Sequence, residues 1–164
     1  MALKIILVDF KGTLYNTETK KMYPNWEIIF QLKMFGLEVW LWSRDELGGT
    51  ERDLRNKIKK KFDKVIISNE KNLELVEDPI ESCVISDHKN DIKMAQKAGA
   101  KTIWIRQSKY KNSWPEKEPD FMVYSLNEAV AKIGMLMMNK TGVGMPKAPY
   151  PEVTRPLLVC FEKN

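Results

Sequence analysis

The segment that most constrains the fold is an apolar run near the start of the chain that ends on an aspartate and a glycine turn. The run within residues 3–8 is continuous rather than alternating, which is typical of a strand buried on both faces in the middle of a parallel sheet. Asp9 follows this run, and Gly12 comes shortly after it. At the carboxyl end of such a strand, Asp9 would lie at the edge where open α/β sheets bind ligands.

Strand and helix patterns alternate along most of the remaining chain. Strands are predicted at 37–43, 65–68, 81–86, 101–105 and 121–124, and helices at 24–36, 50–62, 71–76, 90–98 and 126–138. The polar residues 15–23 are predicted to form a loop or a short flap over the end of the first strand. This alternation predicts an α/β fold, a three-layer Rossmann-like parallel sheet with helices on both faces.

The length and the distribution of glycine and proline set the expected domain organisation. With 164 residues, the chain is long enough for one well-buried core and short for two. Residues 1–138 are predicted to form the α/β domain. Residues 139–164 contain repeated glycines and prolines and are expected to form an extended arm, which packs on its own domain or reaches a second copy of the chain.

Composition and charge exclude several other classes of protein. No stretch approaches the roughly 20 apolar residues of a membrane span, and no signal segment precedes the first strand, so a cytoplasmic protein without membrane contact is expected. Cys83 and Cys160 lie in apolar segments and are expected to be buried thiols. The net charge of +5 leaves nucleic-acid binding open. The basic faces of helices 50–62 and 90–98 are more simply interpreted as solvated surfaces.

Polar residues follow the predicted strands in a recognisable order. The order is Asp9-Phe10-Lys11-Gly12-Thr13-Leu14, then Ser43, then Lys71, then Asp87-His88-Lys89-Asn90-Asp91. Each of these residues alone could simply cap a helix or a turn. Together, in this order and over about residues 3–138, they resemble the haloacid dehalogenase superfamily of phosphatases.

The resemblance implies roles in phosphoryl transfer for three of these residues and one neighbour. Asp9 matches the nucleophile that forms an aspartyl-phosphate, and Ser43 matches the hydroxyl that hydrogen-bonds the phosphoryl group. Lys71 matches the lysine that offsets negative charge, with Lys64 as a weaker candidate. Arg44, next to Ser43, joins Ser43 and Lys71 as an expected phosphate-binding residue.

The resemblance also implies a metal site for Mg²⁺. The expected ligands are the carboxylates of Asp9, Asp87 and Asp91 and the backbone carbonyl of Lys11. Oxygen ligands of this kind suit Mg²⁺, a hard ion that retains several waters. His88, which lies within the last motif, is interpreted as a loop residue without a catalytic role.

Lys11 departs from the pattern of active phosphatases in this superfamily, which have a second aspartate there. That aspartate donates a proton to the leaving group and later accepts one from water, a contribution of roughly 10²–10⁴ in rate. The ammonium group of lysine holds its proton near neutral pH, and Asp9, Asp87 and Asp91 around Lys11 would stabilise the charged form. We therefore expect a slow or restricted phosphatase that favours leaving groups of low pKa. The alternative is an inactive protein of this fold that binds a phosphorylated ligand, a protein or nucleic acid.

The spacing between motifs leaves little room for a cap domain over the site. Residues 14–37 and 43–71 are each too short to hold a cap as well as the core helix. By resemblance, open members act on large substrates such as proteins or nucleic-acid ends, or close the site by forming oligomers. The arm at 139–164 could serve such a homo-oligomer.

Overall fold

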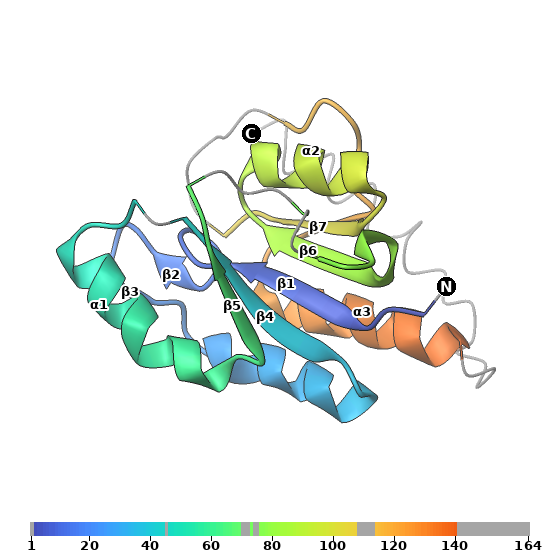
Figure 1. Ribbon diagram of the computed structural model, residues 1–164, viewed down its shortest axis with the longest axis horizontal. Coiled ribbons are helices and arrows are strands. Elements are labelled where there is room, and N and C mark those ends of the chain that lie inside the picture. The colour runs from blue at the N-terminus through green and yellow to red at the C-terminus, as the bar shows by residue number, and fades with distance from the viewer. Residues whose placement is uncertain (1, 45, 70–72, 74–75, 108–113, 141–164) are drawn as a thin grey trace.

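A six-stranded parallel sheet forms the middle layer of the molecule (Figure 1). The computed structural model describes residues 2–44, 46–69, 73, 76–107 and 114–140. The strands are β1 (Ile5–Asp9), β4 (Glu38–Ser43), β5 (Lys64–Ile67), β6 (Ser82–Ser86), β7 (Lys101–Ile105) and β8 (Phe121–Val123). They lie in the order β5-β4-β1-β6-β7-β8, and each neighbouring pair is parallel.

The first strand is the point at which the chain changes direction across the sheet. From β1 the chain builds outward through β4 to β5, and it then returns to the other side of β1 to build β6, β7 and β8. Open α/β sheets bind ligands at the carboxyl ends of the strands beside such a switch point. Asp9, the last residue of β1, lies there.

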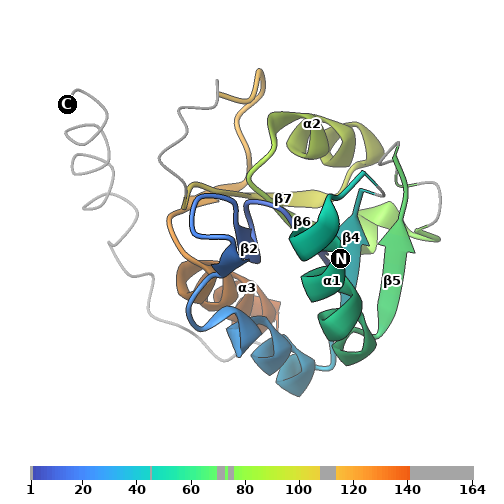
Figure 2. The same ribbon diagram turned by 90° about the vertical axis from the view of Figure 1, so that its left-hand side faces the viewer.

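Helices cover both faces of the sheet (Figure 2). The helices are η1 (Trp26–Phe35), α1 (Gly49–Ile58), η2 (Lys59–Lys61), η3 (Pro79–Glu81), α2 (Lys89–Ala98) and α3 (Leu126–Lys140). One hydrophobic core joins η1, α1 and α3 to the sheet, and a second joins α2, Leu73 and Val76 to the other face. The predicted three-layer Rossmann-like arrangement is confirmed.

Strand and helix ends differ from the predicted ones by few residues. Residues 15–23, predicted as a loop or a short flap, form a short antiparallel hairpin, β2 (Tyr15–Asn16) and β3 (Lys21–Met22). The helix predicted from Pro24 is a 3₁₀ helix that follows Asn25, which has a left-handed backbone (φ 61°). The helix predicted at 50–62 is an α-helix only as far as Ile58, with Gly48 as its N-cap, and continues as the 3₁₀ helix η2.

The start of α3 is capped by side chains, and the prediction of a buried thiol at Cys83 is confirmed. Ser125 Oγ accepts a hydrogen bond from the Glu128 amide (3.2 Å), and Glu128 Oε2 accepts one from the Tyr124 amide (3.0 Å), so a reciprocal cap precedes α3. Cys83 is a buried free thiol, and burial raises its pKa. Across the described part of the chain, no helix has the length and hydropathy to cross a membrane.

Some predicted features fall outside the described residues. These are Lys71 and most of the short helix predicted at 71–76, Cys160, and the extended arm from residue 141 onward. Between β1 and β5, described residues other than strand β4 form the hairpin β2–β3, the helices η1, α1 and η2, and their connecting turns.

Candidate active site

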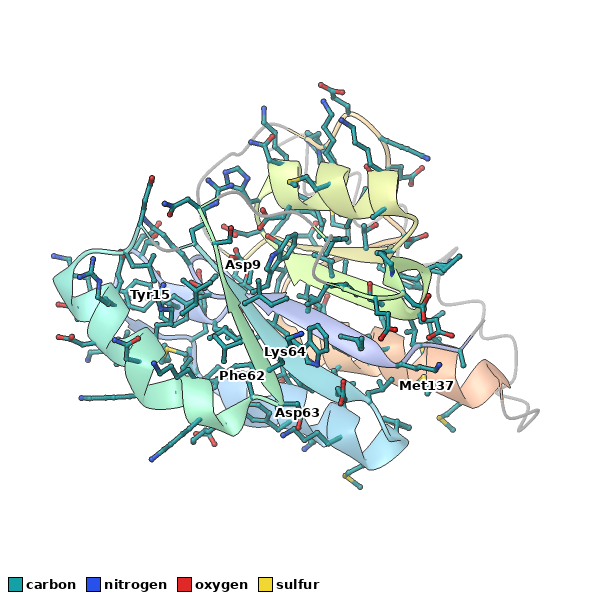
Figure 3. All side chains as sticks on the ribbon, in the orientation of Figure 1. Asp9, Tyr15, Phe62, Asp63, Lys64 and Met137 are labelled. Atoms are coloured by element: carbon teal, nitrogen blue, oxygen red, sulfur yellow. The ribbon has the colours of Figure 1, made fainter. Side chains whose placement is uncertain are left out.

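Asp9 lies at the carboxyl end of the central strand, with only 6% of its surface exposed (Figure 3). Its Oδ2 accepts a hydrogen bond from Thr13 Oγ1 at 3.5 Å and lies 3.3 Å from Ser86 Oγ. β1 pairs with β4 on one side and with β6 on the other. Asp9 is therefore flanked by the residues that end both neighbouring strands.

The turn after Asp9 is tightly hydrogen-bonded and requires a glycine. The amides of Leu14 and Tyr15 both donate to the Phe10 carbonyl at 2.9 Å. Gly12 has φ +81°, a conformation that side chains disfavour. A Cβ placed on Gly12 would overlap the carboxyl group of Asp87. Gly12 is thus the residue that leaves space for Asp87 beside Asp9.

The carboxyl group of Asp87 holds its proton unusually strongly. Burial, followed by the negative charge of Asp9, a hydrogen bond with Asp9 and the charge of Asp91, raises the pKa of Asp87 to about 8. The Asp87 amide donates to Thr13 Oγ1 at 3.2 Å. Asp87 Oδ1 is buried and has no hydrogen-bond partner among the described residues. Asp9 and Asp87 form a close pair of carboxyl groups, which repel each other when both are ionised.

Asp91 lies in the first turn of α2 and is linked to Asp9 through Ser86. Ser86 Oγ lies 2.7 Å from Asp91 Oδ2 and 3.3 Å from Asp9 Oδ2, so its single proton can serve either carboxylate. The His88 amide donates to the same Ser86 oxygen at 3.1 Å. Asp91 is almost fully buried, and Arg44 Nη2 lies 3.8 Å from its Oδ1.

On the opposite side of Asp9, the end of β4 is held by an arginine from α1. Arg55 Nη1 donates to the Arg44 carbonyl at 2.7 Å and to Ser43 Oγ at 3.4 Å. Arg55 and Ser43 are 3% and 1% exposed. The sequence interpretation placed Arg55 on the solvated outer face of its helix, and this is wrong. Arg55 instead shares the buried face of α1 with Ile58, three residues on.

Comparison with known proteins identifies the fold. A family model described as HAD-hydrolase-like matches residues 65–129, a range that includes Asp87 and Asp91 but not Asp9 or Ser43. No curated protein sequence matches the chain. The solved structure of D,D-heptose 1,7-bisphosphate phosphatase from Burkholderia thailandensis superposes with a TM-score of 0.60 at 17% identity, over 80% of this chain and 98% of that one. The chain has the haloacid dehalogenase fold.

Two further structures support this identification. A haloacid dehalogenase-like hydrolase from Streptococcus pneumoniae has a TM-score of 0.60 at 13% identity, over 80% of this chain and 98% of that one. A protein from Bacillus subtilis named as a HAD hydrolase, in a structure bound to magnesium, has a TM-score of 0.58 at 13% identity, over 81% of this chain and 99% of that one. The resemblance indicated by the motifs is confirmed at the level of the superfamily fold.

Within this haloacid dehalogenase fold, the side chain of Lys11 extends away from where the sequence analysis placed it. We expected its ammonium group among Asp9, Asp87 and Asp91. Among the described residues, its ion-pair partner is instead Glu51 in the first turn of α1, with Nζ 3.8 Å from Oε2. The Lys11 side chain is 54% exposed. Its ammonium therefore does not replace a metal ion between the carboxylates.

The other predicted residues have mixed outcomes. Lys64 is the first residue of β5, two strands from β1, whereas Asp9 is the last residue of β1, and Lys64 Nζ lies 4.5 Å from the centre of the Trp40 ring. Lys64 is therefore not the phosphate lysine. Lys71, the preferred candidate, lies outside the described residues. His88 is the N-cap of α2 and its Nδ1 accepts from the Asn90 amide at 3.3 Å, as fits a structural residue.

The carboxyl groups at Asp9 suit a hard cation, although the described residues do not form a complete metal site. Within the described ranges, no group of three or more His, Cys, Asp or Glu side chains is arranged to hold a metal ion. Asp9 and Asp87 nevertheless bring two carboxyl groups into contact, and Asp87 Oδ1 is buried without a hydrogen-bond partner in that part of the chain. Carboxylate oxygens are ligands that Mg²⁺ prefers. A cation there would take the place of the proton that Asp87 retains.

Sequence reasoning missed several residues that support the site. Trp104 Nε1 donates to the Asp87 carbonyl at 3.2 Å, and Gln107 Nε2 donates to the Thr13 carbonyl at 2.8 Å. Both come from the end of β7, which carries none of the matched motifs. Ser86 was overlooked as an ordinary strand residue. Arg55 did have a signal, because it lies three residues before Ile58 on the apolar face of its helix.

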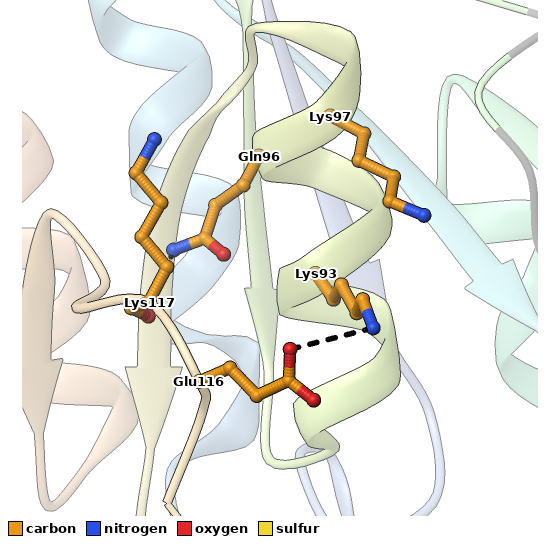
Figure 4. A pocket seen from close by; sticks show the side chains of 5 residues that line it. All are labelled: Lys93, Gln96, Lys97, Glu116 and Lys117. Atoms are coloured by element: carbon orange, nitrogen blue, oxygen red, sulfur yellow. Dashed lines mark hydrogen bonds and ion pairs between the residues drawn. The ribbon is translucent and has the colours of Figure 1, made fainter.

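Two lysines of the predicted basic face of helix 90–98, Lys93 and Lys97, line a groove elsewhere on the surface (Figure 4). It lies between α2 and the loop before β8 and is lined by Lys93, Gln96, Lys97, Glu116 and Lys117. Lys93 Nζ pairs with Glu116 Oε2 at 3.5 Å, and Gln96 Nε2 donates to the Lys117 carbonyl at 3.0 Å. These contacts tie the loop to the helix.

Proposed function

We propose that this chain is a Mg²⁺-dependent phosphohydrolase that acts through an aspartyl-phosphate on Asp9. The observation that carries the proposal is the position of Asp9 at the switch point of a haloacid dehalogenase fold. There it lies between the Ser43 turn and the carboxyl groups of Asp87 and Asp91. The match to the HAD-hydrolase-like family model supports the same class.

In the first step, a carboxylate oxygen of Asp9 attacks phosphorus and the bond to the leaving oxygen breaks. In the second step, water attacks the same phosphorus, which releases inorganic phosphate and regenerates Asp9. Catalysis of this kind depends mainly on positioning and on balancing negative charge. Ser43, Arg44 and Lys71 are the residues proposed to contact the phosphoryl oxygens.

The metal would be held by the carboxylates of Asp9 and Asp87 and by the backbone carbonyl of Lys11, with Asp91 as the second acidic residue of that motif. Bound there, Mg²⁺ would offset negative charge on the phosphoryl group. Ser86 positions Asp91 through a 2.7 Å hydrogen bond. Gly12 leaves the space that Asp87 occupies.

Turnover is proposed to be slow because Lys11 stands where an acid/base aspartate would act. The pairing of Lys11 with Glu51 directs the ammonium toward α1 and adds no proton acceptor beside Asp9. Leaving groups of low pKa need no proton when the bond to phosphorus breaks, so they should be preferred. The same observation supports a second candidate, an inactive protein of this fold that binds a phosphorylated small molecule, protein or nucleic-acid end.

The two candidates are separated by an assay of p-nitrophenyl phosphate hydrolysis with Mg²⁺. The variants are Asp9→Asn and Lys11→Asp, and the matched control is Arg52→Met on the exposed face of α1. Activity in the natural chain that is lost in Asp9→Asn supports the phosphohydrolase. A silent natural chain that gains roughly 10²–10⁴ in rate with Lys11→Asp supports the inactive binder. A folded Lys11→Asp variant without activity contradicts the proposed role of this motif.

A further inference from the structure

Among the described residues, Arg55 is the buried charged residue that the proposed mechanism does not use. It projects from α1 to the end of β4, where Nη1 donates to the Arg44 carbonyl at 2.7 Å and to Ser43 Oγ at 3.4 Å. Only 3% of Arg55 is exposed. A guanidinium group is rarely buried to this extent without a specific role for its hydrogen bonds.

The contact with Ser43 constrains where the serine proton can point. A hydroxyl that accepts a hydrogen bond through one lone pair can still donate its own proton elsewhere. In the structure Ser43 Oγ donates that proton to the Arg44 carbonyl, with 3.2 Å between the two oxygens. The same carbonyl already receives the shorter bond from Arg55. Ser43 can therefore turn its proton to an incoming anion while the carbonyl keeps a hydrogen-bond partner.

The hydrogen bond from Arg55 to the Arg44 carbonyl also fixes the backbone position of Arg44, the residue after Ser43. The backbone of Arg44 is held by Arg55, while its guanidinium group reaches Asp91, with Nη2 3.8 Å from Oδ1. The Arg44 side chain is 44% exposed, so it has access to solvent and to a ligand. Arg55 thus fixes the point from which both Ser43 and Arg44 project.

We propose that Arg55 is a positioning residue of the phosphate site. It holds the Ser43–Arg44 turn so that the serine hydroxyl donates, and the Arg44 guanidinium projects, toward a phosphoryl group at Asp9. This inference rests on the proposed function only in that the site binds phosphate. It does not require turnover.

The test is calorimetric titration of the folded chain with inorganic phosphate in the presence of Mg²⁺. The variants are Arg55→Met, Ser43→Ala and the double variant, with Arg52→Met as the control that removes an exposed guanidinium from the same helix. Arg55→Met should weaken phosphate binding about tenfold to a hundredfold, the usual range for hydrogen bonds to charged groups. Arg52→Met should leave the affinity unchanged.

The double variant distinguishes positioning from a general effect on stability. If Arg55 acts through Ser43, the double variant should bind phosphate about as well as the weaker single variant, rather than showing the product of both losses. Arg55→Lys should give an intermediate affinity, because a single ammonium lacks the planar fork of the guanidinium. Circular dichroism melts identify any variant that fails to fold. If Arg55→Met does so, Arg55→Lys replaces it in the cycle.

Each result has one consequence. Independent losses, an unchanged affinity in the Arg55 variants, or a natural chain that binds no phosphate would overturn the inference. Coupled losses in a chain without hydrolytic activity would uphold it and reject the phosphohydrolase. Hydrolysis with kcat and KM unaffected by Arg55→Lys would uphold the phosphohydrolase and reject the role of Arg55.

Discussion

The two sides of Asp9 are built in different ways. The last residue of β6 and the residues after it form the carboxylate side, which consists of Ser86, Asp87 and Asp91. Residues from the end of β4 and from α1 form the cationic side, which consists of Ser43, Arg44 and Arg55. The carboxylate side comes from one continuous segment, whereas the cationic side joins two elements that are 12 residues apart at Arg55 and Ser43.

This difference in construction has an electrostatic consequence. On the carboxylate side, burial and neighbouring negative charge raise the pKa of Asp87 to about 8. On the cationic side, the buried guanidinium of Arg55 donates to a carbonyl and a hydroxyl. One side is thus suited to accept a cation, and the other is suited to present donors to an anion. Asp9 lies between them, where a phosphoryl group would need both.

The largest expected effect comes from the residue that both sides share. Asp9→Asn removes the nucleophile and should lower hydrolysis of p-nitrophenyl phosphate by a factor on the order of 10⁴ or more. The fold should remain intact, because the amide is nearly isosteric with the carboxyl group. Steady-state kinetics measure the loss of activity, and a circular dichroism spectrum checks that the variant is folded. A variant with more than a tenth of the natural activity would contradict the assignment of Asp9.

The next effect tests whether the carboxylate side depends on the turn after β1. Gly12→Ala combines a strained backbone with an overlap of the new Cβ and Asp87. It should reduce the free energy of unfolding by about 2–4 kcal/mol and abolish Mg²⁺-dependent activity.

Gly36→Ala is the matched control for this substitution. Gly36 has a similar φ of +78°, but nothing lies within 4 Å of the position of its Cβ. Gly36→Ala should therefore lower the free energy of unfolding by only about 1 kcal/mol, and the variant should keep full activity. Urea unfolding of both variants measures the difference. Equal losses in the two would show that the contact between Gly12 and Asp87 is unimportant.

A third prediction concerns the pH dependence of stability on the carboxylate side. The pKa of Asp87 is raised from 3.8 in the unfolded chain to about 8 in the folded one. Between pH 3.8 and about pH 8, the folded state therefore binds a proton on Asp87 that the unfolded state has lost. The stability from this group is present at low pH and is lost as the pH rises toward 8.

Melting temperatures at pH 5 and pH 8 test this prediction. Asp87→Asn should reduce the decline between the two pH values, since the amide cannot ionise. Addition of Mg²⁺ should raise the melting temperature more at pH 8 than at pH 5, because a cation competes with the proton. If the melting temperature of Asp87→Asn fell by the same amount between pH 5 and pH 8, groups other than Asp87 would be the cause.

The smallest expected effect on stability concerns the ion pair between Lys11 and Glu51, which belongs to neither side of Asp9. Glu51→Gln removes the ion-pair partner of Lys11, in a partly exposed pair at 3.8 Å. Such pairs contribute about 0–1 kcal/mol, so the free energy of unfolding should change by less than about 1 kcal/mol. The change should diminish at high salt. Urea titrations at low and high ionic strength measure it, and a large loss would mean that Glu51 has a further structural role.

The carboxylate side could be predicted almost completely from the sequence, because its residues follow one strand at short, fixed spacing. Asp87 and Asp91 are four residues apart at the start of a helix, so they are brought together by local structure. Ser86 was missed only because a serine in a strand has no distinctive pattern. The cationic side was only half predicted. Ser43 and Arg44 follow a strand, but Arg55 was assigned to a solvated face because it lies among other basic residues.

The sequence by itself determined the succession of strands and helices along the chain and the position of Asp9 at the end of the first strand. A continuous apolar run, an aspartate and a glycine turn specify a buried parallel strand that ends in a carboxylate, and these depend on local patterning. Only the tertiary structure decided where the long basic side chains point. Lys11 pairs with Glu51, and Arg55 is buried against Ser43. The physical reason is that long, flexible side chains can reach several partners, and the docking of α1 against β4 selects among them.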